Sequence, residues 1–376
     1  MPITIEQYRE EHIPAVQEFN RRLHTNRGTV EALPFYFFES NVPEWLPQRD
    51  SVPIYQVYYL ALDNGFVRGG YVIKHQDFCF SGNARRIAFY HYPLSEGIAD
   101  RRFAWVGVQM LRKALHENPL LFALGIGGED LALSRMLKAM GWNMTLVPFL
   151  FRVNRPTRVL ANLPQLRNTP FRRLLVGAAS KTGMGWVGVK SLQAIRGWRA
   201  YPRLQANAEE IDSFSSWADR LWEGIASRFA MIAVRDSKNL DVLYPPSKRR
   251  FIRIRVKQGD TVVGWAVLLD TQMQNAKHFG NLRVGSIVDC LALPGREGYV
   301  AQCATKLLNR RGVDLIVTNQ CHSGWVNAFQ RLGYLSGPTN FVFAVSPELA
   351  KLMHPFEESL QRTHLTRGDG DGPIRL

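Results

Sequence analysis

The sequence lacks the features of three common special classes of protein. Its four cysteines, among 376 residues, include no Cys-x-x-Cys pair, so we expect neither a disulfide framework nor a metal site. No apolar run approaches the roughly 18 residues of a membrane-spanning helix. The first residues carry charges where a signal peptide needs an apolar stretch. These absences favour a protein of the reducing cytoplasm.

Acidic residues are missing from a long stretch in the middle of the chain. Lys and Arg total 47 against 32 Asp and Glu, a formal charge of +15, yet no acidic residue lies between Asp130 and Glu209, where thirteen residues are basic. Residues 165–203 mix basic with apolar side chains, a pattern that suits peripheral attachment to an anionic membrane surface. The alternatives are a basic connector packed between two domains and, less favoured, a nucleic-acid contact without a recognisable module.

The remaining composition is that of an ordinary globular chain. Hydrophobic residues make up 46% and charged residues 21%, which excludes a mostly disordered, collagen-like or coiled-coil protein. The length indicates two domains.

An internal repeat organises the chain into two copies of one α/β unit. Four landmarks occur in both copies at similar spacing. Ile13 and Ile211, 198 residues apart, belong to predicted amphipathic helices over 10–23 and 208–222, and Val67 and Val262, 195 apart, begin apolar strands. Pro93 and Pro294, 201 apart, end long strands, and Gly141 and Gly333, 192 apart, end helices. Short insertions in loops account for the differences in spacing.

Further elements repeat in the same order and set the expected domains. Each long strand is followed by a loop and a helix, at 101–115 and 299–311, then a buried strand, at 119–127 and 313–320, and finally closing strands, at 144–153 and 339–346. The sequence therefore predicts a first domain over 1–155, a basic connector over 156–205 and a second domain over 206–350. Residues 351–376 are expected to form a tail whose glycine-rich end, from 366, is disordered.

This order of elements, ending in the helices MLKAMGW and AFQRLGY, resembles the GNAT acyltransferase family, twice. The resemblance implies an α/β (α+β) fold in which each unit is a mixed twisted sheet flanked by helices. It also implies that a splayed central strand presents backbone groups to the pantetheine arm of acyl-CoA, while the following loop and helix N-terminus bind its pyrophosphate. The donor substrate would be acetyl-CoA or another acyl-CoA. The acceptor would be an amine on a small molecule or on a glycan or cell-envelope precursor.

The family's phosphate-binding motif is Arg or Gln, two residues, Gly, one residue, then Gly or Ala, and both copies match it in part. The first copy keeps Arg102 and Gly107, with Trp105 in place of the first glycine. The second copy has Arg296 and Gly298 near the expected place, at a different spacing. The resemblance implies that these four residues lie at the donor's phosphates.

Acyl transfer to an amine needs a base, a group that polarises the thioester carbonyl and an acid for the thiolate. In the second copy Asp289 lies where several family members carry the general-base glutamate, and the backbone of Leu291 and Leu293 would polarise the carbonyl. Burial in an apolar strand would raise the pKa of Asp289 toward that of a useful base. The alternative is an aspartate bonded to a neighbouring loop.

The tyrosine that many members use as acid is Leu137 in the first copy and Phe329 in the second. His322, just after a buried strand, is the candidate replacement, helped by Asn319; the alternative is a capping or surface histidine. In the first copy we expect Ala88 to occupy the position that corresponds to Asp289.

His91, Ser95 and Glu96 supply polar groups at the end of the first copy's long strand, and Glu96 could instead open a loop that caps the next helix. Two other functions remain compatible with these residues. Tandem units of this kind also resemble FemAB-type transferases, which use aminoacyl-tRNA, and the basic middle would suit such a donor. With both phosphate motifs incomplete, the chain could also be a scaffold without catalysis.

Overall fold

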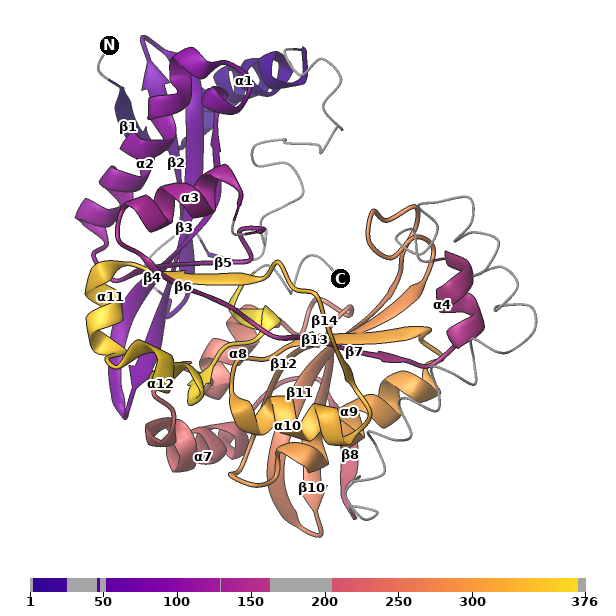
Figure 1. The fold of residues 1–376 in the computed structure, drawn as a ribbon. Coiled ribbons are helices and arrows are strands. Elements are labelled where there is room, and N and C mark those ends of the chain that lie inside the picture. Colours follow the sequence, from indigo (N-terminus) through magenta and orange to yellow (C-terminus); the bar gives the residue numbers. More distant parts are fainter. Residues whose placement is uncertain (1–2, 26–45, 48–51, 129, 163–204, 371–376) are drawn as a thin grey trace. The chain divides into compact units, whose positions relative to one another are not determined.

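The described residues of the computed structural model are 3–25, 46–47, 52–128, 130–162 and 205–370, and they form two compact units. Unit 1 consists of Met1–Leu146 and Asn340–Glu357, and unit 2 of Val147–Thr339 and Glu358–Leu376 (Figure 1). Residues 165–203, for which the sequence predicts a basic segment, lie outside the described residues.

Unit 1 is built on one mixed sheet with the strand order β1-β2-β3-β4-β5-β15-β6. Along this order the β4–β5 pair is parallel, and the other neighbouring strands pair antiparallel. The strands are β1 (Thr4–Gln7), β2 (Tyr55–Asp63), β3 (Phe66–Phe80), β4 (Asn83–Ser95), β5 (Leu121–Leu124), β15 (Val342–Val345) and β6 (Asn143–Leu146). The turn at Asn64 and Gly65, both at positive φ, is the kind that joins two strands in a tight hairpin, so β2 leads directly into β3.

Helices cover both faces of the sheet in unit 1. Phe19 and Leu23 of α1 (Ile13–Thr25) pack on one face, and Val106 and Met110 of α2 (Ala104–Glu117) pack on the other. The unit also contains α3 (Ala132–Ala139) and α11 (Pro347–Leu352). α12 (Phe356–Leu360) follows α11 in the chain.

Unit 2 repeats this plan, with the strand order β14-β7-β13-β12-β11-β10-β8 and a parallel β12–β13 pair. The strands are β14 (Leu335–Gly337), β7 (Phe149–Val153), β13 (Leu315–Asn319), β12 (Arg283–Ala292), β11 (Thr261–Gln272), β10 (Ile252–Gln258) and β8 (Asn207–Ile211). Two short strands, β9 (Met231–Ala233) and β16 (Thr363–His364), pair in parallel. The helices are α4 (Pro156–Asn162), α7 (Ser216–Ile225), α8 (Ser237–Leu243), α9 (Glu297–Arg310) and α10 (Ser323–Arg331). Among the described residues, no helix combines the length and the apolar character needed to cross a membrane.

The predicted fold class is confirmed, since each unit is a mixed sheet flanked by helices. One element differs from the sequence prediction. The sequence predicts one helix over 208–222, but Asn207–Ile211 form β8, paired with β10, and the helix starts only after Ser215. Backbone pairing with β10 outweighs the helical spacing of the apolar residues there.

The closing strands of the two repeats are exchanged between the units. β7 follows β6 in the chain but pairs with β13 and β14 in unit 2, whereas β15 follows β14 but pairs with β5 and β6 in unit 1. Pro148 lies between β6 and β7, and Pro338 between β14 and β15. A proline favours extended backbone in the residue before it, so the chain continues instead of folding back as a hairpin. The compact units therefore differ from the sequence ranges 1–155 and 206–350, because 147–155 belong to unit 2 and 340–350 to unit 1.

The C-terminal segment differs most from the prediction of a tail with a disordered end. Residues 363–369 contain β16 and a 3-10 turn (Arg367–Asp369), and Thr366 and Asp369 are buried. Thr366 begins the turn with a capping box, in which its N–H donates to the Asp369 carboxylate and its hydroxyl accepts from Gly368 N. Residues 371–376 lie outside the described residues.

Candidate functional site

A wedge opens between two parallel strands in each unit. In unit 1, β4 pairs with β5 only at Ala88 and Phe89, and in unit 2, β12 pairs with β13 only over Val284–Ser286. Each long strand also has a bulge just beyond this pairing, at Tyr92, whose φ is 50°, and at Val288. A bulge bends a strand and re-aims its backbone groups, so β4 and β12 diverge from their parallel neighbours at corresponding places.

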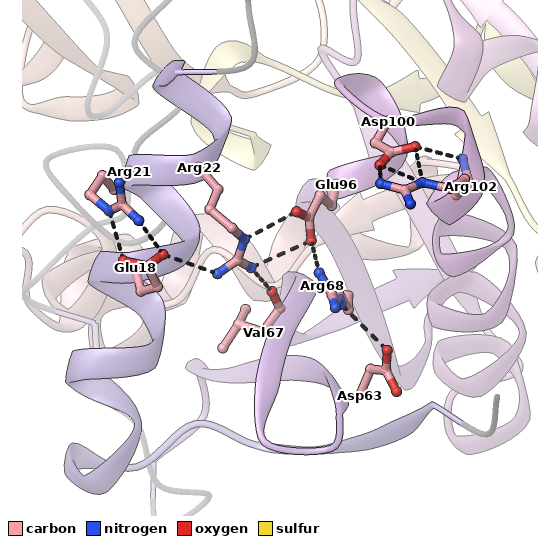
Figure 2. Close-up of polar contacts among 9 residues, drawn as sticks. All are labelled: Glu18, Arg21, Arg22, Asp63, Val67, Arg68, Glu96, Asp100 and Arg102. Atoms are coloured by element: carbon pink, nitrogen blue, oxygen red, sulfur yellow. Dashed lines mark hydrogen bonds and ion pairs between the residues drawn. The ribbon is translucent and has the colours of Figure 1, made fainter.

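Glu96 fixes the connection from β4 to α2 in unit 1. This side chain is 4% exposed, and its carboxylate accepts hydrogen bonds from Arg22 Nε of α1, at 3.1 Å, and from Arg68 Nη1 of β3, at 2.8 Å (Figure 2). The Arg68 guanidinium also lies 4.2 Å from the ring centroid of Phe103, which directly precedes α2. A buried carboxylate shared by two guanidinium groups holds its neighbours firmly, so Glu96 positions the start of α2.

Arg102 lies in the 3-10 turn (Arg101–Phe103) just before α2, and Gly107 lies in the first turn of α2. The Arg102 side chain is 84% exposed and forms a two-pronged ion pair with Asp100, whose carboxylate also accepts the Arg102 N–H (Figure 2). The hydrogen bonds from Arg102 lower the pKa of Asp100. A Cβ at Gly107 would meet only Ser95 Oγ, at 3.8 Å, so no contact within the protein requires glycine there.

Arg296 and Gly298 flank the start of α9 in unit 2. Arg296 Nη1 donates to Tyr299 Oη at 3.1 Å, and Gly298 is buried in the first helical turn. Glu297 lies between them, and its carboxylate accepts from Gly295 N at 3.3 Å. An acidic side chain therefore already occupies the positive end of this helix, where an anionic ligand would bind.

Asp289 lies in a fully buried charge network. Arg235 Nε is 2.9 Å from Asp289 Oδ2, and Arg235 Nη2 is 2.6 Å from Asp369 Oδ1, with all three side chains at zero exposure. The hydroxyls of Tyr244 and Thr366 donate to the Asp289 carboxylate at 2.8 and 3.0 Å. Burial raises the pKa of Asp289, and the Arg235 guanidinium opposes that rise. A base must reach its substrate, and these partners already surround the carboxylate, so the geometry favours a structural role.

The backbone of Leu291 and Leu293 does not fit the role expected of it. Leu293 N donates to the backbone oxygen of Val263 in β11 at 2.9 Å, so this N–H is already bonded within the sheet. Because hydrogen-bonding direction alternates along a strand, Leu291 faces β11 as well, and the N–H groups that face the wedge belong to Cys290 and Ala292. Cys290 N donates to the Asp289 carboxylate at 3.0 Å.

His322 is the N-cap of α10, where its Nδ1 accepts from Gly324 N at 3.2 Å. Desolvation lowers the pKa of His322 to about 4, so the ring is neutral at pH 7. A neutral imidazole is a poor acid for a leaving thiolate. Asn319 does not support the ring; its Oδ1 accepts from Arg367 Nη1 at 3.2 Å in the C-terminal segment.

His91 is the residue of unit 1 that corresponds in register to Asp289. Val72 faces His91 across β3 and β4, and Val267, its counterpart in the repeat, faces Asp289 across β11 and β12. Alignment of Pro93 with Pro294 predicts Ala88 at this place, and that prediction is wrong because the two prolines are not equivalent: Pro93 lies within β4, whereas Pro294 lies beyond the end of β12. The bulge at Val288 also shifts the register by one residue, so counting along the sequence does not find His91. The His91 ring is buried next to the bulge, with its centroid 4.6 Å from that of Phe89.

Comparisons with known proteins agree with this architecture. No family model and no curated protein matches the sequence. Three solved structures have the same fold at 10% sequence identity: a GCN5-related N-acetyltransferase from Anabaena variabilis (TM-score 0.52; 91% of this chain and 72% of that one), a probable N-acyltransferase from Enterococcus faecalis (0.52; 94% and 74%) and N-myristoyltransferase from Saccharomyces cerevisiae with bound myristoyl-CoA (0.51; 92% and 84%).

These matches cover both repeats, so the chain has the GNAT fold in two tandem copies, with degenerate motifs. The described residues hold no group of three His, Cys, Asp or Glu side chains placed to bind a metal ion.

Proposed function

We propose that the protein is an N-acyltransferase that moves an acetyl or longer acyl group from acyl-CoA to an amine. The observation that carries the proposal is the wedge beside β4, which opens at a bulge and is followed by the rigidly held start of α2. Backbone groups that lack a neighbouring strand suit the amides of a pantetheine arm, and a helix N-terminus suits its phosphates. The yeast structural neighbour, which holds myristoyl-CoA, supports this class of donor.

The reaction requires a proton acceptor near the wedge. The amine loses a proton and attacks the thioester carbonyl, the new C–N bond forms, the C–S bond breaks, and the CoA thiolate takes up a proton. His91 is the basic side chain of β4 next to the bulge, so we propose that it accepts the amine's proton. The acceptor class, an amine on a small molecule or a glycan precursor, is part of the proposal.

Donor binding is tested by thermal unfolding with and without acetyl-CoA. A ligand of the native state at about 100 times its dissociation constant adds roughly 2.7 kcal/mol of stability, so the melting temperature should rise by a few degrees. Myristoyl-CoA, a longer-chain donor, is measured in parallel. If no acyl-CoA raises the melting temperature, the proposed donor is wrong, and aminoacyl-tRNA or a scaffold role becomes the better explanation.

The role of His91 is tested by His91→Gln, with His75→Gln as the matched control. His75 is a histidine of the adjacent strand, stacked on Tyr55 and opposite Ala88, where β4 and β5 still pair. We expect His91→Gln to lower kcat by about 10²-fold to 10⁴-fold, since general-base catalysis contributes on that scale, and His75→Gln to leave kcat within about threefold. Equal rates for the two variants would remove His91 from the mechanism.

A further inference from the structure

We infer that the chain binds one acyl-CoA, in unit 1, because its own C-terminal segment, residues 363–370, occupies the corresponding wedge of unit 2. The inference rests on the proposed function and assigns its donor site to one repeat. It is carried by contacts within unit 2, by the burial of the segment and by the charges at the two helix starts.

Thr366 contacts both arms of the wedge in unit 2. Its backbone forms an antiparallel bridge with Gln320, just beyond the end of β13, and its hydroxyl donates to Asp289 of β12 at 3.0 Å. Cys321 N donates to Leu365 O at 3.1 Å, which extends the same pairing by one residue. The segment therefore lies between β12 and β13 past the point where these strands separate. In the described part of unit 1, no β-bridge places a third segment between β4 and β5.

The segment is part of the interior of unit 2. Residues 363–366 have no exposed surface, and Arg235 holds Asp369 by an ion pair of 2.6 Å. A Cβ at Gly368 would lie 2.1 Å from Tyr244 Oη and 3.1 Å from Asp289 Cβ, so only glycine fits at this place. Displacing the segment for a ligand would take Asp369 from the buried Arg235 and the Thr366 hydroxyl from Asp289, which is unfavourable because both contacts satisfy buried charged groups. A pantetheine arm and residues 363–370 therefore exclude each other.

The charges at the N-termini of α2 and α9 also favour unit 1 over unit 2 as the donor site. The first turn of α2 contains no acidic residue, and the two carboxylates that precede it, Glu96 and Asp100, are each paired with arginine side chains. By contrast, α9 begins with Glu297, which lies in its first turn. A carboxylate at a helix N-terminus takes the favourable position of a ligand's phosphate and repels it. Unit 1 thus offers an anion site at the helix that follows its wedge, and unit 2 does not.

The test is calorimetric titration of the full-length protein with acetyl-CoA, comparing Ala104→Asp with Glu297→Gln. Ala104 is the exposed first residue of α2, and an acid there complements the helix dipole, so this variant should remain folded. We expect one site per chain, about threefold to tenfold weaker binding for Ala104→Asp, and a dissociation constant within twofold of wild type for Glu297→Gln. A melting curve of each variant confirms that it is folded.

Other outcomes separate this inference from the proposed function. Two sites per chain, or tighter binding by Glu297→Gln with no effect of Ala104→Asp, would place a donor in unit 2 and overturn the inference while the function stands. No binding of acetyl-CoA or myristoyl-CoA by the wild-type protein would overturn the proposed function, and the inference with it.

Discussion

Residues 1–155 alone are expected not to form a stable folded unit, although the repeat in the sequence makes them look like a complete domain. The sheet of unit 1 takes β15 from the second repeat, between β5 and β6. Its four residues, Val342–Val345, are fully buried. Burying one large apolar side chain contributes about 1.5–3 kcal/mol, so losing β15 removes an amount comparable with the 5–15 kcal/mol that stabilises a typical domain.

The matched variant restores that strand in one chain. Leu146 of β6 pairs with Val342 of β15, so a short glycine-containing loop can join residues 1–146 to 342–357 as a hairpin. We expect this fusion to unfold cooperatively on heating, as followed by circular dichroism, and the fragment 1–155 to show no cooperative transition. Cooperative unfolding of both at the same temperature would contradict the strand exchange as a requirement for folding.

The sequence predicts the order of elements well because hydrophobic period and turn residues are local signals. It predicts closing strands at 144–153 and 339–346, but the sheet that each strand joins depends on partners between 162 and 223 residues away in the chain. Pro148 and Pro338 are the available signals, since each follows a short strand of the structure, β6 or β14, and disfavours a hairpin. The prediction of one strand over 144–153 runs across Pro148 and therefore misses this signal.

The candidate site shows the same limit on a smaller scale. Asp289 is correctly expected to be buried, but Arg235 and Asp369, the groups that decide its role, lie 54 and 80 positions away in the chain. The same holds for the glycine-rich C-terminal segment. Its composition predicts disorder, but Tyr244 and Asp289 enclose Gly368 in the structure. Residues of this kind are ordered by distant partners, and no local pattern reports them.

Arg235→Met should destabilise unit 2 more than any surface substitution. The variant keeps most of the side-chain volume but leaves the buried carboxylates of Asp289 and Asp369 without a cation. Burial alone would lower the pKa of Arg235, yet the two carboxylates raise it, so the guanidinium remains charged in the native protein. Removing one partner of a buried ion pair typically lowers the free energy of unfolding by about 3–5 kcal/mol.

Urea unfolding followed by tryptophan fluorescence measures this loss, with Arg102→Met as the control. Arg102 also pairs with a carboxylate, Asp100, but its side chain is 84% exposed, and exposed pairs contribute about 0–1 kcal/mol. Adding Asp289→Asn and Asp369→Asn to Arg235→Met should recover part of the stability, because neutral amides no longer require a counter-charge. If Arg235→Met and Arg102→Met unfold at the same urea concentration, the network does not hold the C-terminal segment. If the triple variant recovers nothing, the loss comes from packing around Arg235 rather than from its charge.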